Sequence, residues 1–513
     1  MLPIISEASV THSIFAAMSI TNPTTTLQSI IAHSKEYGFI FPSSEIYDGL
    51  AAVYDYGPYG ADLKKNIRDY WWKCMTQAHQ NIVGIDAAIF MHPTTWKASG
   101  HIDSFSDPMV DNKDSNKRYR VDHLIESYAA TLASTDSPEM GNREGEKIIA
   151  EMEALLAADN LAGIKTLLET HNITCSISGT CNWTEVRQFN LMFSTEFGAV
   201  AASVEGEENM VYLRPETAQG IFVNFLNVQK SARMKIPFGI AQTGKAFRNE
   251  IVARQFIFRM REFEQMEMQF FVRPGTQQHW YNYWKQERLN WHLSLGIPAS
   301  QYKYHDHVKL AHYADAATDI EYKFPIGFKE VEGIHSRTNY DLTQHQTYSK
   351  KKQQYFDADI DPETGKAYGN YIPYVVETSI GLDRMFMLLL SEAYTEEDLS
   401  TPEKQDSRVV LKLPAILAPV KLAIFPLTKK DGLPEAAQKI MDDCKMAFKC
   451  FYEEKDAIGK RYRRQDAIGT PFCITIDYQT LEDNTVTIRQ RDTMAQERIA
   501  IEDIKKIILA TIS

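Results

Sequence analysis

Apolar side chains recur at helical spacing in the first 90 residues of the chain. Between Asp62 and Gln80 they share one face of a predicted helix, formed by Leu63, Ile67, Tyr70, Trp71 and Cys74. A shorter amphipathic helix is predicted at Leu27–Ser34, and a strand at Ile82–Phe90. Gly, Pro and Tyr are frequent at 37–60, which predicts a stretch rich in turns between the two helices.

A predicted strand near position 265 alternates in an unusual way. One face carries Met266, Met268 and Phe270, which suits a core, and the other carries Phe263, Gln265, Glu267 and Gln269. An aromatic ring, a carboxylate and two amides favour a ligand-lined surface, although an ordinary sheet with one solvated face has a similar pattern. The sequence around it predicts strands in 210–272 and 318–341, with a helix at Tyr281–Leu293.

Two segments differ in character from this main body, which we place at 27–394. At 127–170 apolar positions recur at helical spacing among acidic residues, so we expect an inserted helical hairpin without a core of its own. Residues 1–26 lack a steady period and are expected to form a flexible leader. Whether Met18 is the true start stays open.

A polar stretch at 395–407 is the best candidate for a domain boundary, and we assign 395–410 as a linker. After it the sequence predicts a small mixed α/β domain at 411–513. Its expected strands are Leu422–Phe425, Phe472–Ile476 and Thr485–Ile488, and its expected helices are Pro434–Glu454 and Ile501–Ala510.

Composition narrows the class of protein. The 513 residues are 44% hydrophobic and 24% charged, as in globular proteins, and no run approaches the roughly 18 apolar residues of a membrane span. Six thinly spread cysteines and a first basic side chain at Lys35 favour a cytoplasmic location. The net charge of −12 argues against non-specific coating of nucleic acid. Residues 411–513 nevertheless carry 17 Lys/Arg against 15 Asp/Glu, which suits binding at chosen points.

The chain has no GxxxxGK[ST] or GxGxxG loop, so arginines would have to hold phosphate. Three segments, in order, resemble the three motifs of the class II aminoacyl-tRNA synthetases. They are YDYGPYG at 54–60 with the helix and strand that follow, the segment Arg248–Glu267, and ETSIGLDR at 377–384 leading into an apolar helix. The resemblance implies an α+β fold, with an antiparallel sheet flanked by helices.

Other segments narrow the resemblance to the glycyl-specific enzymes of the dimeric (α2) type. YLRPETAQG at 212–220 and EGIHSRTNYD at 332–341 carry this likeness. GKRY at 459–462, GTP at 469–471 and TIR at 487–489 resemble a mixed α/β anticodon-binding domain. The resemblance covers about 35–125 and 173–513. It implies ATP-dependent ligation of glycine to tRNA(Gly) through glycyl-adenylate, with transfer to the 3′-terminal ribose. It also implies a homodimer packed through the first motif, and neither DNA nor a membrane as partner.

The resemblance assigns roles in ATP binding. Arg248 would hold the α-phosphate and the attacking carboxylate, and Arg384 would reach the terminal phosphate; both are expected to be catalytic. Phe263 would stack on adenine near Glu250, and Glu330 is the candidate ligand of Mg²⁺. The full implied ATP set is Arg248, Asn249, Glu250, Phe258, Arg259, Met260, Arg261, Glu262, Phe263, Glu330, Val331, Gly381, Leu382, Asp383 and Arg384.

Glycine offers only an ammonium and a carboxylate for recognition, so carboxylates are the required partners of the ammonium. The resemblance assigns this role to Glu216, Glu267 and Glu377. Ser379 would stand where a larger amino acid places its β-carbon, and would reject alanine sterically. The full implied glycine set is Arg120, Glu216, Phe263, Glu264, Gln265, Met266, Glu267, Glu377, Thr378, Ser379, Ile380 and Gly381.

No structural zinc is expected. Cys175 and Cys181 lie where bacterial relatives often have half of a zinc site, but the other half would fall near Asn112 and Ser115, which offer no thiolate. The histidines His305, His307 and His312 are interpreted as a packed, hydrogen-bonded connector.

Two alternative functions stay open. One is a class II synthetase for proline, threonine or serine. The other is a non-catalytic, synthetase-like nucleic-acid-binding protein, which is disfavoured because Arg248, Glu250, Phe263 and Arg384 are all present. In the C-terminal domain, the basic segment Lys460–Arg464 with Tyr462 is expected to contact the phosphates and bases of an anticodon loop.

Overall fold

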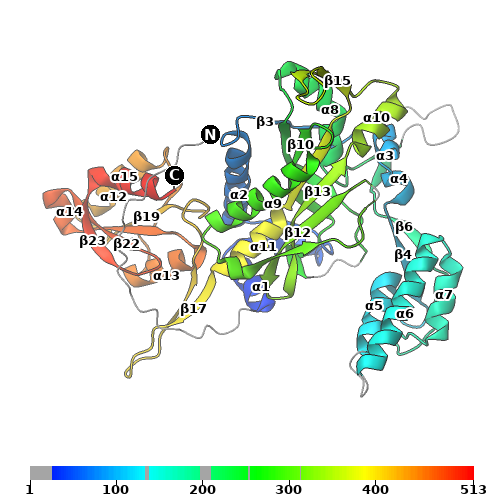
Figure 1. Cartoon of the computed structure of the whole chain (residues 1–513). Helices are drawn as coiled ribbons and strands as arrows, with labels where there is room; N and C mark the ends of the chain where they lie inside the picture. The colour runs from blue at the N-terminus through cyan, green and yellow to red at the C-terminus, as the bar shows by residue number, and fades with distance from the viewer. Residues whose placement is uncertain (1–25, 133–137, 197–209, 252–254, 312, 513) are drawn as a thin grey trace.

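The computed structural model describes residues 26–132, 138–196, 210–251, 255–311 and 313–512. The chain forms a central body, an insertion that projects from it and a C-terminal domain (Figure 1). All but the last residue of the expected leader, 1–26, lies outside the described residues. The first described element is α1 (Leu27–Glu36), which confirms the helix expected at Leu27–Ser34 and is capped by the side chain of Thr26.

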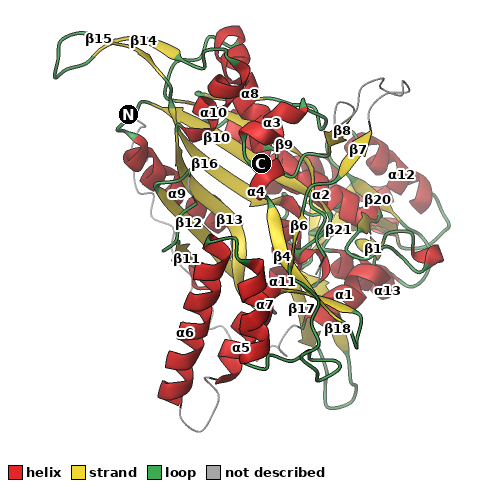
Figure 2. Cartoon of the chain, turned by 90° about the vertical axis from the view of Figure 1, so that its right-hand side faces the viewer, coloured by secondary structure: helices red, strands yellow, loops and turns green. Residues whose placement is uncertain are grey.

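A seven-stranded sheet forms the centre of the described body, in the order β11-β12-β13-β16-β10-β9-β3. Every pair of neighbours among these strands is antiparallel except β3 and β9. Figure 2 shows β9, β10, β16 and β13 crossing the middle of the body. The strands are β3 (Ile82–Gly84), β9 (Phe238–Phe247), β10 (Glu262–Val272), β11 (Tyr302–Asp306), β12 (Ala316–Phe324), β13 (Gly327–Thr338) and β16 (Tyr374–Gly381).

Helices cover the two faces of this sheet unequally. On one face Met266, Met268 and Phe270 of β10 join a large core with α2 (Pro58–Thr76), α9 (Gln277–Ser294) and α11 (Leu382–Ala393). On the other face α8 (Ala218–Ser231) and α10 (Tyr340–Ser349) pack against Phe271 and Val375. α8 and α10 cover this face only around Phe271 and Val375. They leave uncovered the part of the face where β10 carries its polar side chains.

All three motif segments fold as the resemblance implies. The first is β2 (Tyr54–Tyr56), α2 and β3; the second is β9 and β10 joined by a loop; the third is β16 running directly into α11. The strand expected at Ile82–Phe90 is shorter than predicted, because regular pairing with β9 ends at Gly84.

The helices expected within 127–170 are present, but the expectation that the insertion has no core of its own is wrong. The insertion comprises a three-stranded sheet, β4 (Ser106–Asn112), β5 (Lys117–Arg120) and β6 (Arg187–Asn190), packed on three helices. These helices are α5 (Val121–Leu132), α6 (Pro138–Ala157) and α7 (Leu161–Thr170). They bury a separate cluster, which includes Val110, Val121, Ile125, Ile148, Ile164, Leu168 and Trp183. Residues on both sides of 127–170 complete that core, which the helical periodicity alone does not reveal.

The segment expected as a linker is a β-hairpin instead of an irregular connector. Strand β17 (Tyr394–Asp398) pairs with β18 (Ser407–Leu411), and Leu411 and Leu413 belong to the core of the central body. Arg408 of β18 is buried and donates to Asp466 of the C-terminal domain at 2.9 Å. The hairpin therefore joins the two domains through an apolar contact on one side and a buried ion pair on the other.

The C-terminal domain has a five-stranded sheet in the order β20-β19-β21-β22-β23, parallel for the first three strands and antiparallel after them. Its strands are β19 (Leu422–Pro426), β20 (Cys450–Tyr452), β21 (Phe472–Ile476), β22 (Thr485–Gln490) and β23 (Gln496–Ala500). Its helices are α12 (Leu433–Cys444), α13 (Ile458–Ile468), α14 (Tyr478–Asp483) and α15 (Ile504–Ile512). The helix predicted at Pro434–Glu454 is wrong in its second half, which forms β20.

The remaining elements are short. They are the strands β1 (Ile40–Pro42), β7 (Ser194–Glu196), β8 (Met210–Tyr212), β14 (Tyr355–Ile360) and β15 (Ala367–Tyr371), and the helices α3 (Pro93–Ala98) and α4 (His101–Ser104).

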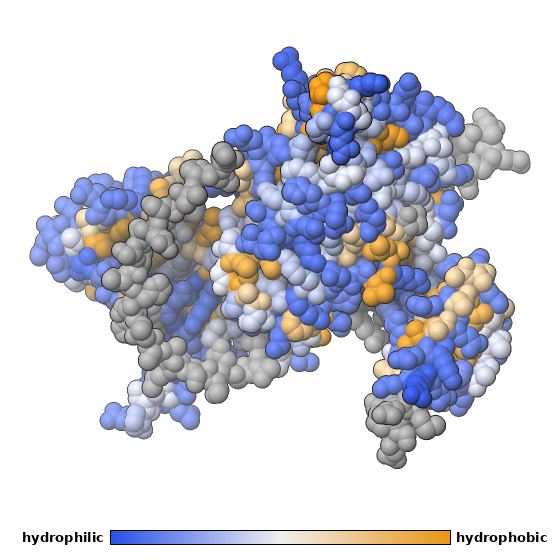
Figure 3. Space-filling model, in the orientation of Figure 1, coloured by the Kyte–Doolittle hydropathy of each residue, from blue (hydrophilic) through white to orange (hydrophobic). Residues whose placement is uncertain are grey.

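Most of the surface seen in Figure 3 is hydrophilic, and apolar side chains appear there only in small patches. Among the described helices, none combines the length and apolar character that crossing a membrane requires.

Candidate functional site

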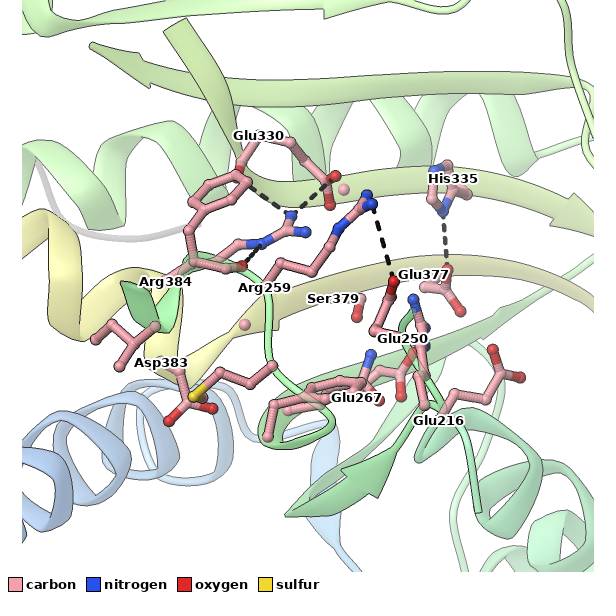
Figure 4. A pocket seen from close by; sticks show the side chains of 18 of the residues that line it. Glu216, Glu250, Arg259, Glu267, Glu330, His335, Glu377, Ser379, Asp383 and Arg384 are labelled. Atoms are coloured by element: carbon pink, nitrogen blue, oxygen red, sulfur yellow. Dashed lines mark hydrogen bonds and ion pairs between the residues drawn. The ribbon is translucent and has the colours of Figure 1, made fainter. Parts of the chain in front are cut away.

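A cavity of about 250 Å³ opens at the end of the sheet face that α8 and α10 leave uncovered. Its walls come from β10, β13, β16, the first turn of α11 and the loop between β9 and β10 (Figure 4). Fifteen of the sequence-predicted residues line it: Glu216, Arg248, Glu250, Phe258, Arg259, Met260, Phe263, Gln265, Glu267, Glu330, Glu377, Ser379, Gly381, Asp383 and Arg384.

Five predicted residues lie next to these in the sequence and are buried in the core instead. Alternation explains those on β10 and β16, whereas Val331 lies at a register shift between β12 and β13 and Leu382 begins α11. Because neighbouring strand residues face opposite sides of a sheet, the members of a contiguous motif cannot all reach one ligand through their side chains. The five are Met266, Val331, Thr378, Ile380 and Leu382, each at most 1% exposed.

Five other predicted residues are engaged outside the cavity wall. Glu264 forms an ion pair with Arg68 at 2.8 Å, and Glu262 pairs with Lys245. Asn249 and Arg261 belong to the loop before β10, where Arg261 donates to the carbonyl of Glu250 at 2.9 Å. Arg120 lies in β5 of the insertion.

Arg120 is held by two carboxylates of the insertion. It pairs with Asp107 at 3.3 Å and with Asp122 at 2.5 Å. The structure therefore leaves the expected contact of Arg120 with glycine as a prediction.

One end of the cavity is formed by Arg384 and Glu330. The guanidinium of Arg384 pairs with the Glu330 carboxylate at 2.9 Å and lies over the ring of Phe258, 4.6 Å from its centroid (Figure 4). This contact with Arg384 lowers the pKa of Glu330. A fixed cation beside an ionised carboxylate, with an aromatic ring next to them, offers partners for a phosphate chain and its metal ion.

Arg248 occupies the middle of the cavity between two aromatic rings. Its guanidinium carbon lies 5.3 Å from the ring centroid of Phe263 and 5.5 Å from that of Phe105. Its Nε donates to the carbonyl of Pro215 at 3.1 Å. Rings around a planar guanidinium fix its orientation, which is the condition for bidentate binding of phosphate or carboxylate.

The opposite end of the cavity gathers three carboxylates, Glu216, Glu267 and Glu377. They come from the turn before α8, from β10 and from β16, so the fold brings together residues up to 161 positions apart. Glu377 accepts from Arg337 at 3.0 Å and from Gln269 at 2.6 Å, and contacts His335 at 2.8 Å. Glu267 accepts a hydrogen bond from the hydroxyl of Thr217.

The pKa values of these three carboxylates are shifted in different directions. Burial and the charges of Glu377 and Glu216 raise the pKa of Glu267 well above its ordinary value. Burial also acts on Glu377 and Glu216, but nearby cations outweigh it: Arg337 and His335 lower the pKa of Glu377, and His101 and Arg337 lower that of Glu216. The surroundings of the three carboxylates thus favour the neutral form of Glu267 and the ionised forms of Glu216 and Glu377.

Several residues of the cavity wall were not among those predicted: Ile257, Tyr313, Gly333, His335 and Arg337. The segment 332–341 was noted for its likeness to known enzymes but received no role. Period-two alternation along β13 could have placed Gly333 and His335 opposite Ser379 and Glu377, as the register shows. Tyr313 comes from an irregular segment, where no periodic signal points to it.

Two hydroxyl groups lie next to the thiol of Cys175, one of the two cysteines considered as zinc ligands. The Cys175 thiol lies 3.3 Å from the Ser115 hydroxyl and 3.1 Å from that of Tyr119. Within the described ranges, no group of three or more His, Cys, Asp and Glu side chains is arranged to hold a metal ion.

Of the histidines near position 305, His307 has the hydrogen bond expected from the sequence, whereas the side chain of His305 is 56% exposed. His307 lies 2.9 Å from Asp319, and His305 lies 3.5 Å from Glu321. His312, the third member of the group, lies outside the described residues.

The basic segment Lys460–Arg464 is less available to RNA than expected. Arg461 is 2% exposed and donates to the carbonyls of Pro426 and Glu453. The Tyr462 hydroxyl bonds to Thr475, and Arg464 pairs with Glu453 at 2.8 Å. These side chains therefore hold α13 in place, and the prediction that the whole segment contacts the anticodon loop is wrong for Arg461.

Three family models match the chain. The class II tRNA synthetase core domain (G, H, P, S and T) matches residues 201–393, and the anticodon binding domain matches 421–511. Insertion domain 1 of glycyl-tRNA synthetase matches residues 107–145 and 136–191. The last match shows that the resemblance also extends over residues 126–172, which lie outside the range expected from the sequence motifs.

Curated relatives match over nearly the whole chain. The glycine–tRNA ligase of Chlorobaculum tepidum is 52% identical over 482 residues, covering 92% of this chain and 97% of the relative. That of Treponema denticola is 48% identical and covers 92% and 94%. A solved structure titled as the RNA binding domain of threonyl-tRNA synthetase from Cryptosporidium parvum matches with a TM-score of 0.58 at 14% identity, covering 94% of this chain and 98% of that one. That last likeness concerns the fold alone. The chain belongs to the glycine–tRNA ligase family, which is built on the class II synthetase core and its anticodon-binding domain.

Proposed function

We propose that this chain ligates glycine to tRNA(Gly) by forming glycyl-adenylate in the cavity described above. The observation that carries the proposal is the division of charge along the cavity. Three carboxylates converge at one end, Arg384 with Glu330 forms the other, and Arg248 lies between them. A substrate with an ammonium at one end and a polyphosphate at the other matches this order.

Adenylate formation in this site needs no nucleophile from the protein. The carboxylate of glycine attacks the α-phosphate of ATP, and pyrophosphate leaves, so the residues act by positioning and by stabilising charge. Arg248 would contact both the attacking carboxylate and the α-phosphate. Arg384 would hold the terminal phosphate, while Phe263 would stack on the adenine beside Glu250.

Mg²⁺ fits the nucleotide end of the cavity. Mg²⁺ usually binds one or two carboxylates together with substrate phosphates, rather than a full cage of protein ligands. Glu330 offers one ionised carboxylate whose side chain is 45% exposed, next to the cation proposed to hold the phosphate chain. The ion would supply charge neutralisation for the leaving pyrophosphate.

Glycine recognition would combine charge with steric exclusion. Glu216, Glu267 and Glu377 surround the ammonium, and the ion pair of Arg337 with Glu377 fixes one of them. Ser379 lies between Glu267 and Gly333 in the sheet, where it limits the space for a β-carbon. Filled space is an effective barrier to a larger amino acid.

A homodimer is the finer part of the proposal. In class II enzymes the first motif packs against its copy, and here exposed apolar side chains lie just before that motif. Ile46 is 87% and Tyr47 is 80% exposed in the turn before β2. Sedimentation velocity should therefore give twice the mass of the 58.6 kDa chain. A monomer at micromolar concentration would remove this part of the proposal.

A cytoplasmic location is proposed on the state of the cysteines. All six lie in the described part of the chain and are free thiols.

The function itself is tested by charging. Purified protein, ATP and total tRNA should give aminoacylated tRNA with labelled glycine, whereas labelled proline, threonine and serine should give none. Charging with one of those three would favour the alternative synthetase. Binding of tRNA without any charging would favour a non-catalytic protein.

A further inference from the structure

The polypeptide leaves the central body for the insertion right beside the cavity. A single residue, Phe105, separates α4 from β4, and the chain returns at the end of β6, where Asn190 pairs with Ser106. Figure 1 shows β4 and β6 as the connection between the body and the helices of the insertion. Just before the outgoing strand β4, two aromatic side chains contact residues of the cavity: His101, the first residue of α4, and Phe105.

His101 contacts one of the carboxylates at the glycine end. Its Nε2 lies 3.5 Å from Oε2 of Glu216, and the two side chains are only 13% and 16% exposed. The imidazole is held by Ser99, whose hydroxyl lies 2.8 Å from Nδ1, and by the edge contact with Trp96. A fixed ring beside a partly dehydrated carboxylate restricts the rotation of Glu216.

Phe105 contacts the arginine in the middle of the cavity. It supplies one of the two rings next to the Arg248 guanidinium, the other being Phe263. Phe263 is the ring proposed to stack on adenine. Phe105 has no proposed contact with a substrate, so its contact with Arg248 serves only to hold that side chain. The ring of Phe105 also contacts His101, at 5.3 Å between centroids, so the two form one unit.

The returning strand completes the link through the backbone. Leu191 donates to the carbonyl of Phe105 at 3.0 Å, and its own carbonyl accepts from the N–H of Asn249 at 2.8 Å. Phe105 is thus connected to the residue after Arg248 by hydrogen bonds as well as by ring contact. Both connections to the insertion therefore end on the loop that carries Arg248.

We infer that His101 and Phe105 are positioning residues, which set Glu216 and Arg248 in place from the segment that leads into the insertion, just before β4. The positions of Glu216 and Arg248, which adenylate formation needs, thereby depend on how the insertion is attached to the central body. This inference rests on the roles proposed above for Glu216 and Arg248. Neither His101 nor Phe105 lines the cavity itself, so both act through another side chain.

The test compares variants in glycine-dependent pyrophosphate exchange, which needs no tRNA. Phe105→Leu should lower kcat about 10- to 100-fold through displacement of Arg248, with KM for glycine nearly unchanged. Phe105→Tyr keeps the ring face and should stay within about twofold of wild type. His101→Ala should do the reverse, raising KM for glycine about tenfold with little change in kcat.

Phe189→Leu is the matched control, because Phe189 lies in β6 of the same insertion and outside the cavity wall. Equal kinetics for Phe105→Leu and Phe189→Leu would overturn the inference, as would loss of activity in Phe105→Tyr to the level of Phe105→Leu. If Phe105→Leu lowers Tm, Phe105→Met replaces it under the same criteria. Arg248→Lys and Glu216→Gln serve as references. If they too leave exchange unchanged, the proposed roles of the cavity fail; if they impair it while the Phe105 and His101 variants do not, only this inference fails.

Discussion

Glu267 and Ser379 lie directly opposite each other across the antiparallel pair of β10 and β16, and Gly333 follows Ser379 on the next strand. Side chains opposite each other in such a pair have β-carbons about 4.5–5.5 Å apart. The carboxylate proposed to bind the ammonium is therefore set against a small side chain at a separation fixed by the backbone. In the proposed function, recognition of the ammonium and exclusion of larger amino acids therefore depend on residues that lie side by side on neighbouring strands.

Substrate size should change when Ser379 is made smaller. Ser379→Gly removes the side chain proposed to exclude a β-carbon, so kcat/KM for alanine relative to glycine should rise about tenfold or more, since a methylene of space corresponds to 1–3 kcal/mol. Pyrophosphate exchange with each amino acid measures the ratio. Ser336→Gly, a buried serine on β13 that does not line the cavity, is the control for strand flexibility. The same ratio in both variants would exclude Ser379 as the barrier.

Arg248→Lys should impair adenylate formation while leaving the charge in place. Lysine loses the planar fork and its contacts with the two rings, so the transition state should lose about 2–4 kcal/mol. Single-turnover adenylate formation with saturating ATP and glycine gives the rate directly. A rate within twofold of wild type would contradict the role assigned to Arg248.

Protonation of Glu267 should make glycine binding pH-dependent. Burial and the charges of Glu377 and Glu216 raise its pKa well above the ordinary value, while an ammonium would favour its ionised form, so KM for glycine should fall as pH rises. Binding should also release a proton, which makes the calorimetric enthalpy depend on the ionisation enthalpy of the buffer. A buffer-independent enthalpy would contradict this account.

The same raised pKa has a cost in stability. Above the pKa of an unfolded glutamate, the native state binds more protons at Glu267 than the unfolded state does, so stability decreases as pH rises toward the native pKa. Glu267→Gln stays neutral and should therefore raise Tm relative to wild type at pH 8 but not at pH 4, while weakening glycine binding. An equal shift of Tm at both pH values would mean that the carboxyl group is not the cause.

Asp466 should be essential for the C-terminal domain. It is fully buried and accepts from Arg489 at 2.8 and 2.9 Å and from Arg408 at 2.9 Å. Asp466→Asn leaves the buried guanidinium of Arg489 without its carboxylate and that of Arg408 with Glu397 alone, which should lower the free energy of unfolding by about 3–5 kcal/mol. Asp492→Asn, at a 54% exposed partner of Arg491, should cost less than about 1 kcal/mol in the same denaturant titration. Similar losses for both would contradict the buried network.

The sequence predicts the parts of this molecule in which local pattern and tertiary environment agree. The alternation of Glu267 and Met266 identifies both faces of β10, and the three motif segments have the expected strands and helices. Within one contiguous motif, the residues that face the cavity are harder to distinguish from those that lie in the core. Ile380, for instance, is adjacent to Ser379 and lies in the core because its side chain alternates to the other face.

Features that depend on distant partners were missed. Val110 and Ile164 share the core of the insertion, but no periodic signal connects residues 54 positions apart. Arg461 lies in a basic segment that is typical of RNA contacts, yet its side chain is buried and donates to the carbonyls of Pro426 and Glu453. His101, in α4, is close to Glu216 only in the folded chain, since the two are 115 positions apart in the sequence. In each case the deciding contact is with a segment that the local sequence does not contain.

The central claim is that one cavity recognises glycine by three carboxylates and activates it through Arg248. Pyrophosphate exchange by the purified protein, measured with ATP, Mg²⁺ and each amino acid in turn, tests it most directly. The account predicts exchange with glycine alone, a loss of about 30-fold or more in Arg248→Lys, and a raised KM for glycine in Glu267→Gln. Exchange with proline, threonine or serine, or glycine-dependent exchange that is unchanged in both variants, would contradict it.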